Sequence, residues 1–92
     1  MGLRPLFFGR RDMALAVVIA QVLPHSIAAK KKIAAGDRLL SMNGHAIEDV
    51  LDYRFYLTEP RLTLSLQTAA GKLRTVRVRK AEEEDLGLEF ES

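Results

Sequence analysis

The segment 33–49, IAAGDRLLSMNGHAIED, limits the possible folds of this chain more than any other segment. Gly36-Asp37 predicts a turn, and the apolar run Arg38–Met42 predicts a short strand. Asn43-Gly44 follows at once, and both residues tolerate the positive φ that the two central positions of a type I′ turn require. His45–Ile47 can then pair back as a brief strand. The segment therefore predicts a turn, a strand and a tight hairpin in direct succession.

The length and composition predict one domain with a modest core. The chain has 92 residues, of which 48% are hydrophobic, and a formal net charge of +2. That charge is too small to indicate nucleic-acid binding by itself. The chain has no cysteine, which excludes disulfides, a thiolate nucleophile and the usual zinc or iron–sulfur ligand sets. We therefore expect no metal and no cofactor.

Residues 1–13 predict a tail in front of a domain that spans residues 14–92, with Leu6–Phe8 as an apolar island in the tail. Arginines followed by the apolar run Met13–Leu23 also have the outline of a secretory signal. Gln21 interrupts that run, which is about half the length of a membrane span. Cleavage near Ser26 would remove a predicted strand. We therefore expect a cytoplasmic domain with no membrane segment.

The remaining strands are predicted from hydrophobic patterns. Arg61–Gln67 alternates, with leucines at 62, 64 and 66 on one face, and this is the pattern of a half-buried strand. Lys72–Lys80 places Val76 and Val78 inward by the same rule. The other two predicted strands are Ala16–Leu23 and Leu86–Phe90.

Two helices are predicted between these strands. Ser26 is a suitable N-cap for a short helix over Ile27–Lys32. The second helix is Glu48–Leu57, which begins with aspartates and ends before Pro60. Its expected apolar stripe consists of Val50, Leu51, Phe55 and Leu57.

The stretch VLPHSIAAKKKIAAGDRLLSMNG resembles the part of a PDZ domain that runs from the third strand through the first helix to the central hairpin. The resemblance covers about residues 17–90. It implies an α+β fold, with a curved antiparallel sheet or partly open barrel of five to six strands capped by two helices. The chain departs from the pattern at His25 and Lys32, where such domains commonly have glycine. We therefore expect His25 in a strained turn.

The end of the sequence, Leu86–Phe90, resembles the GLGF-type loop that normally precedes this stretch. The resemblance therefore implies a circularly permuted PDZ domain of bacterial type. VLDYRFYLTE and EEEDLGLEFE are also similar to the N-terminal PDZ-like domain of bacterial proteins with a radical-SAM-like iron–sulfur module. This likeness implies a non-catalytic domain that serves an attached or partner enzyme.

For function, the resemblance implies that a peptide, in the first place a protein C-terminus, adds as a strand beside residues 88–91. The backbone N–H groups of Leu86, Gly87 and Leu88 would hold its carboxylate. Leu57 would join the two leucines in a pocket for the last side chain, and Glu89 and Phe90 would continue the strand. The helical wall would present Tyr53, Arg54 or Tyr56, and spacing leaves that choice open.

The acidic run Glu82–Asp85 stands directly before this loop, where a base would favour carboxylate binding. Repulsion between two charges at 4 Å costs about 1 kcal/mol in water and about 4 kcal/mol near a protein surface. We therefore expect weak carboxylate binding, with Lys80 offsetting part of the negative field of the acidic run. We also expect a preference for ligands with Lys or Arg upstream of the terminus.

Two other functions stay open. The domain could be regulatory, with its groove filled by its own chain. Alternatively, its basic residues (Lys30, Lys31, Lys32, Arg74, Arg77, Arg79 and Lys80) could bind RNA or another polyanion weakly. His25 and His45 are expected to be solvated turn residues, because neither has a companion at ligand spacing. We expect a monomer.

Overall fold

The computed structural model describes residues 17–91, so the predicted tail over residues 1–13 lies outside the described part. The elements are β1 (Val17–Val22), α2 (Ile27–Lys30), β2 (Arg38–Met42), β3 (His45–Ala46), α3 (Val50–Tyr56), β4 (Arg61–Gln67), β5 (Leu73–Arg79) and β6 (Leu88–Phe90). The six strands form one antiparallel sheet in the order β5-β4-β2-β1-β6, and β3 pairs with β2. The predicted α+β fold is confirmed.

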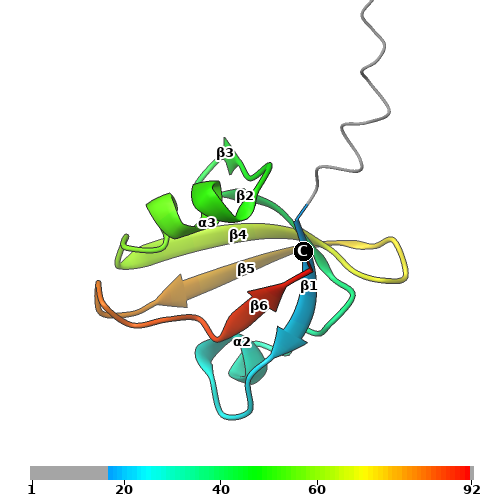
Figure 1. The fold of residues 1–92 in the computed structure, drawn as a ribbon, viewed down its shortest axis with the longest axis horizontal. Helices are drawn as coiled ribbons and strands as arrows, with labels where there is room; N and C mark the ends of the chain where they lie inside the picture. Colours follow the sequence, from blue (N-terminus) through cyan, green and yellow to red (C-terminus); the bar gives the residue numbers. More distant parts are fainter. Residues whose placement is uncertain (1–16, 92) are drawn as a thin grey trace, which may run out of the picture.

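The sheet is strongly curved, as Figure 1 shows. The β1–β6 pair lies across the front of the β4–β5 hairpin, and β2 connects the two parts because it pairs with both β1 and β4. The helix α2 lies at one end of the β1–β6 pair, and α3 lies near the opposite end of the molecule. Among residues 17–91, no helix is long and apolar enough to cross a membrane.

The core follows the predicted alternation. The leucines at 62, 64 and 66 of β4 are at most 1% exposed, and Val76 and Val78 of β5 are also buried. They pack with Ile19, Leu39 and Met42 from the neighbouring strands. β4 and β5 are each buried on one face, so a shift of one residue would expose their leucines or valines, and the register of this hairpin is fixed for this reason.

The central hairpin has the predicted turn. Asn43 has φ 51° and Gly44 has φ 83°. The Asn43 side chain has a further role, because its Oδ1 accepts from the Thr63 amide at 2.8 Å and its Nδ2 donates to the Arg61 carbonyl at 3.1 Å. The tip of the hairpin is thereby fixed against β4.

The first helix is shorter than predicted. Ser26 is its N-cap, and its Oγ accepts from the Ala29 amide at 3.1 Å. The helix ends at Lys30 because Lys32 turns the chain with φ 62°. His25 has φ 65°, which confirms the expected strained turn.

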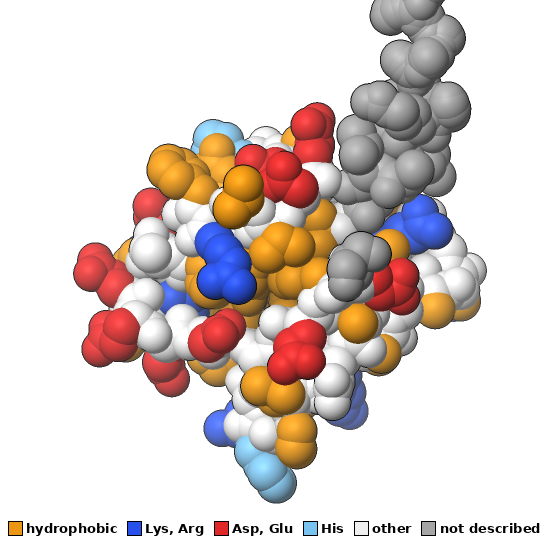
Figure 2. Space-filling model, viewed as in Figure 1, with side chains coloured by type: hydrophobic (Ala, Val, Ile, Leu, Met, Phe, Trp, Pro, Cys, Tyr) orange, Lys and Arg blue, Asp and Glu red, His pale blue; other side chains and the backbone are white. Residues whose placement is uncertain are grey.

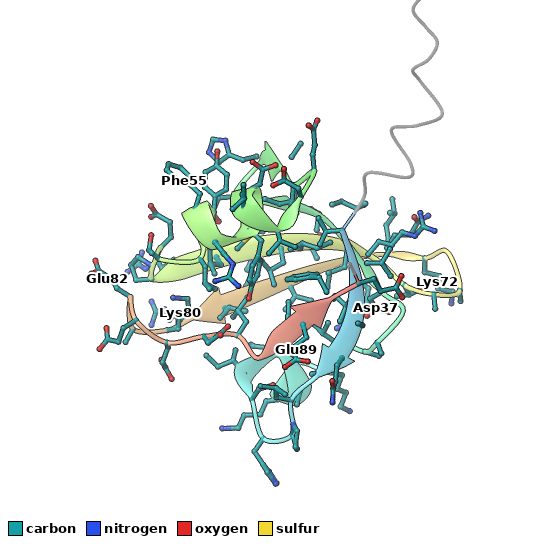
Figure 3. The ribbon with its side chains drawn as sticks, in the orientation of Figure 1. Asp37, Phe55, Lys72, Lys80, Glu82 and Glu89 are labelled. Atoms are coloured by element: carbon teal, nitrogen blue, oxygen red, sulfur yellow. The ribbon has the colours of Figure 1, made fainter. Side chains whose placement is uncertain are left out.

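The predicted apolar stripe on α3 is wrong at two of its four positions. Leu51 and Phe55 are 74% and 72% exposed, whereas Tyr53 is only 4% exposed. Figure 3 shows Phe55 pointing away from the sheet. Asp49 caps the helix and fixes its start at Val50, so that Val50, Tyr53 and Leu57 share its inner face at the spacing of three and four residues. Hydrophobicity alone assigned the wrong residues to that face.

Candidate functional site

A groove separates α3 from β6. It contains a cavity of about 270 Å³ lined by Val50, Tyr53, Arg54, Leu57, Asp85, Leu88, Glu89 and Phe90. Figure 2 shows hydrophobic side chains gathered between the helix and the strand, with acidic and basic side chains at their margin. The groove therefore has an apolar floor and a charged rim.

Within residues 17–91, the β6 wall is an edge of the sheet, with β1 as its one neighbour in the strand order. The Gly87 carbonyl and the Glu91 amide both bond to the β1 side of β6. Backbone groups of alternate residues in an antiparallel strand point to the same side. The N–H and C=O groups of Leu88 and Phe90 consequently point to the other side, away from β1. This free edge faces the groove.

The loop before β6 is held tightly against the β1–α2 connection. The Leu86 carbonyl accepts from the Ala28 amide and the Gly87 carbonyl accepts from the Leu23 amide, both at 2.9 Å. In a trans peptide the N–H points opposite to the C=O. The N–H groups of Gly87 and Leu88 therefore point away from this connection and toward the groove.

Only glycine fits at position 87. Gly87 has φ +90°, and a Cβ on it would lie 2.2 Å from the Ser26 Cβ. Such a contact is far inside any tolerable separation, and the positive φ is itself unfavourable for other residues. The close approach of the loop to the N-cap of α2 thus depends on this glycine.

Asp85 occupies the space in front of the loop amides. Its Oδ1 accepts from the Gly87 amide at 3.2 Å and makes a long hydrogen bond of 3.4 Å with the Tyr53 hydroxyl. Burial, followed by the charge and hydrogen bond of Asp85, raises the pKa of Tyr53 well above its ordinary value. The Tyr53 ring also contacts Phe90 edge-on, with centroids 4.7 Å apart. Tyr53 therefore links the helical wall to both the loop and the strand.

The structure brings most of the predicted site residues together. Leu57, Leu88, Glu89 and Phe90 line the cavity, as do two of the three candidates left open on α3, Tyr53 and Arg54. The third candidate, Tyr56, stacks instead on His45 with centroids 4.5 Å apart and does not line the cavity. Leu86 is fully buried in the core, and Gly87 forms the loop beside the cavity rather than its lining.

The sequence did not single out Asp85 among the four acids that stand before the loop, and the structure places it in the cavity lining. Lys80, expected to offset the field of that run, is 8% exposed and donates from Nζ to the carbonyls of Ala81 and Glu82. Figure 3 shows Lys80 and Glu82 at the turn after β5, away from Glu89 on the β6 wall. A single acid of the run reaches the cavity lining, and only the fold shows which one.

The groove has the features of a binding site. Within residues 17–91, no group of three His, Asp or Glu side chains could hold a metal ion. What the site offers is a free strand edge, an apolar floor and two backbone N–H groups beside a carboxylate. The model of the PDZ domain family matches residues 18–68, more than half of the chain. The matched stretch runs from β1 through β4, and the groove strand β6 lies outside it.

Proposed function

The chain belongs to the PDZ domain family, whose members are protein- and peptide-binding modules, and on this premise we propose that an extended peptide binds between β6 and α3. The peptide adds as a strand, and its backbone pairs with the free N–H and C=O groups of Leu88 and Phe90. One observation carries the proposal: the free edge of β6 faces α3 across a cavity of about 270 Å³. Residues 17–91 leave this space open, which favours docking over a groove filled by a segment of that part of the chain.

The charges around the groove support a preference among ligands. Among the described residues, Arg54 is the one cation in the cavity lining, against the two carboxylates of Asp85 and Glu89. Three more acids, Glu82–Glu84, precede the loop. A peptide with Lys or Arg beside its apolar anchor is therefore favoured over an acidic peptide of the same length.

Two leucines of the helical region give a matched test. Leu57 lines the groove, whereas Leu51 is exposed and lies outside the cavity lining. We expect L57A to weaken binding of a labelled basic nonapeptide about fivefold to tenfold, because an apolar contact of about 1 kcal/mol is lost. L51A should bind like the wild-type protein. Fluorescence anisotropy measures both affinities, and equal losses in the two variants would place the peptide elsewhere.

The mode of attachment is also part of the proposal. The groove strand β6 follows β5 in the chain but pairs with β1, and this order supports a circularly permuted domain. The likeness of VLDYRFYLTE and EEEDLGLEFE to domains joined to a radical-SAM-like module supports service to an iron–sulfur enzyme. An iron–sulfur absorbance spectrum from the polypeptide that carries this domain is the expected result. A cluster-free enzyme with the domain attached would contradict it.

A second candidate function rests on a different surface. A hollow of about 400 Å³ over the β4–β5 hairpin is lined by Lys31, Arg61, Arg77 and Arg79 along with uncharged residues. Arg61 pairs with Arg79 in the register, and four cations around one hollow suit a phosphate backbone. Single-stranded RNA should then bind with an affinity that falls steeply between about 50 and 200 mM salt, whereas strand addition in the groove should change little. Salt-independent RNA binding would exclude this candidate.

A further inference from the structure

We propose that Asp85 is a built-in occupant of the carboxylate site, so that the groove binds an internal segment of an extended polypeptide and rejects a free C-terminus. This inference deepens the proposed function and rests on it. It assigns to Asp85 a role in ligand selection that the sequence did not reveal.

The loop amides before β6 point to the groove. Hydrogen bonds from Ala28 and Leu23 fix the carbonyls of Leu86 and Gly87 on the side of α2. The N–H groups of the same two peptide units, which belong to Gly87 and Leu88, therefore point to the groove. Two adjacent N–H groups in a loop with a positive-φ glycine form a concave site for an anion.

This site already contains an anion, the carboxylate of Asp85. The Asp85 Oδ1 lies 3.2 Å from the Gly87 nitrogen and 3.4 Å from the Tyr53 hydroxyl oxygen. Tyr53 is 4% exposed and cannot swing into solvent without opening the core, so it holds the carboxylate from the helical side. One of the two loop amides is thus bonded within the chain before any ligand arrives.

The charge around the site is unfavourable for a second carboxylate. An incoming terminal carboxylate would meet Asp85 at the loop and Glu89 on the strand, with Arg54 as the one cation that residues 17–91 place in the lining. Like charges at such short range repel. A peptide that continues past the loop, or ends in a carboxamide, brings no such charge. The backbone edge of β6 can still pair with it.

The test uses the full 92-residue chain and two fluorescein-labelled nonapeptides of identical sequence, with two lysines upstream of a final valine. One peptide ends in a free carboxylate and the other in a carboxamide. We expect the wild-type protein to bind the carboxamide at least as tightly as the carboxylate. D85A removes both the side chain that occupies the Gly87 amide and its charge, and it should bind the carboxylate at least tenfold tighter than the carboxamide.

E83A is the matched control, because it makes the same change to alanine and the same change in net charge at an acid of the same run that lies outside the cavity lining. It should keep the wild-type ratio of the two affinities. The inference is overturned if the wild-type protein already prefers the free carboxylate tenfold, or if E83A shifts the ratio as much as D85A does. The first result would show an open carboxylate site, and the second a general effect of charge.

A second measurement does not depend on peptide binding. Sodium acetate supplies a small carboxylate, and ¹⁵N amide shifts of Gly87 and Leu88 report its entry. We expect saturable shifts at both amides in D85A and none in the wild-type protein; equal shifts in both proteins would overturn the inference. If neither peptide binds any variant, the proposed function fails, while the acetate titration still decides whether Asp85 fills the site.

Discussion

Gly44 and Gly87 have nearly the same backbone conformation, with φ of 83° and 90°, but the two turns depend on the rest of the molecule to different degrees. Nothing lies within 4 Å of a Cβ built on Gly44, which is at the tip of the β2–β3 hairpin. A Cβ on Gly87 would overlap Ser26, which is 61 positions earlier in the chain. The hairpin turn is thus specified by its own two residues. The groove loop is specified by a contact with another part of the fold.

The largest expected effect comes from alanine substitutions that test this difference between Gly44 and Gly87. G44A forces alanine into the left-handed region, which costs about 1–2 kcal/mol of unfolding free energy. G87A carries the same cost and adds about 1–3 kcal/mol of overpacking against Ser26. Urea unfolding followed by far-UV circular dichroism should therefore show a clearly larger loss for G87A. Equal losses would mean that the loop yields freely.

The double variant S26G/G87A separates the two costs. Glycine replaces serine at an N-cap with a loss of only a few tenths of a kcal/mol, while it removes the Cβ and Oγ that a residue at 87 would strike. We expect S26G/G87A to regain about 1–3 kcal/mol relative to G87A, the overpacking part, and to retain the conformational part. The variant S26G alone measures the cost of the cap.

The next largest effect comes from substitutions of Asn43 in the hairpin turn. Asn43 combines φ 51° with hydrogen bonds to the backbones of Thr63 and Arg61 on β4. N43A loses both bonds and strains the turn, and should cost about 2–3 kcal/mol. N43G loses the bonds but adopts the conformation readily, so it should be about 1 kcal/mol more stable than N43A. Urea midpoints compare the two. If N43G is as stable as the wild-type protein, the bridge to β4 contributes nothing.

These two regions also explain what the sequence could predict. The hairpin and the strand β4 follow from local chemistry, because Asn43-Gly44 and the alternation of leucines leave little choice. The bounds of β4 were accordingly predicted to the residue. The strained turn at His25 could be predicted because the family pattern has glycine there.

The groove was less accessible to sequence reasoning. The inner face of α3 depends on where Asp49 caps the helix, and an apolar stripe through Leu51 and Phe55 was the wrong choice. The separate destinations of Tyr53 and Tyr56 depend on the same rotation of the helix. No local pattern distinguishes Asp85 from its three acidic neighbours. Its position depends on Tyr53, which is 32 residues away in sequence.

The smallest expected effect tests that long-range contact through pH. The pKa of Tyr53 is raised in the folded state above the value of about 10 for an unfolded chain. Tyr53 therefore remains neutral in the fold when the unfolded chain has begun to ionise. Its contribution to stability is complete below pH 10 and declines as pH rises further, by at most about 1.4 kcal/mol per pH unit. The unfolding free energy of Y53F should fall less steeply with rising pH than that of the wild-type protein. Lysines and arginines titrate in both proteins, so the difference between the two curves reports Tyr53 alone.

The chain has two tyrosines, so Y56F leaves Tyr53 as the one source of tyrosinate absorbance. In Y56F we expect no ionisation until the protein unfolds, as judged by far-UV circular dichroism on the same samples. Burial is the largest cause of the raised pKa and Asp85 comes second, so D85N in the same background should lower the ionisation pH only part of the way toward 10. Ionisation of native Y56F near pH 10 would contradict a buried Tyr53 at the groove. A shift in D85N all the way to 10 would instead make Asp85, and not burial, the main cause. Either result would change the explanation of how Tyr53 joins α3 to the groove loop. The same measurements therefore test whether this loop is a rigid feature of the fold, as its contact with Ser26 requires.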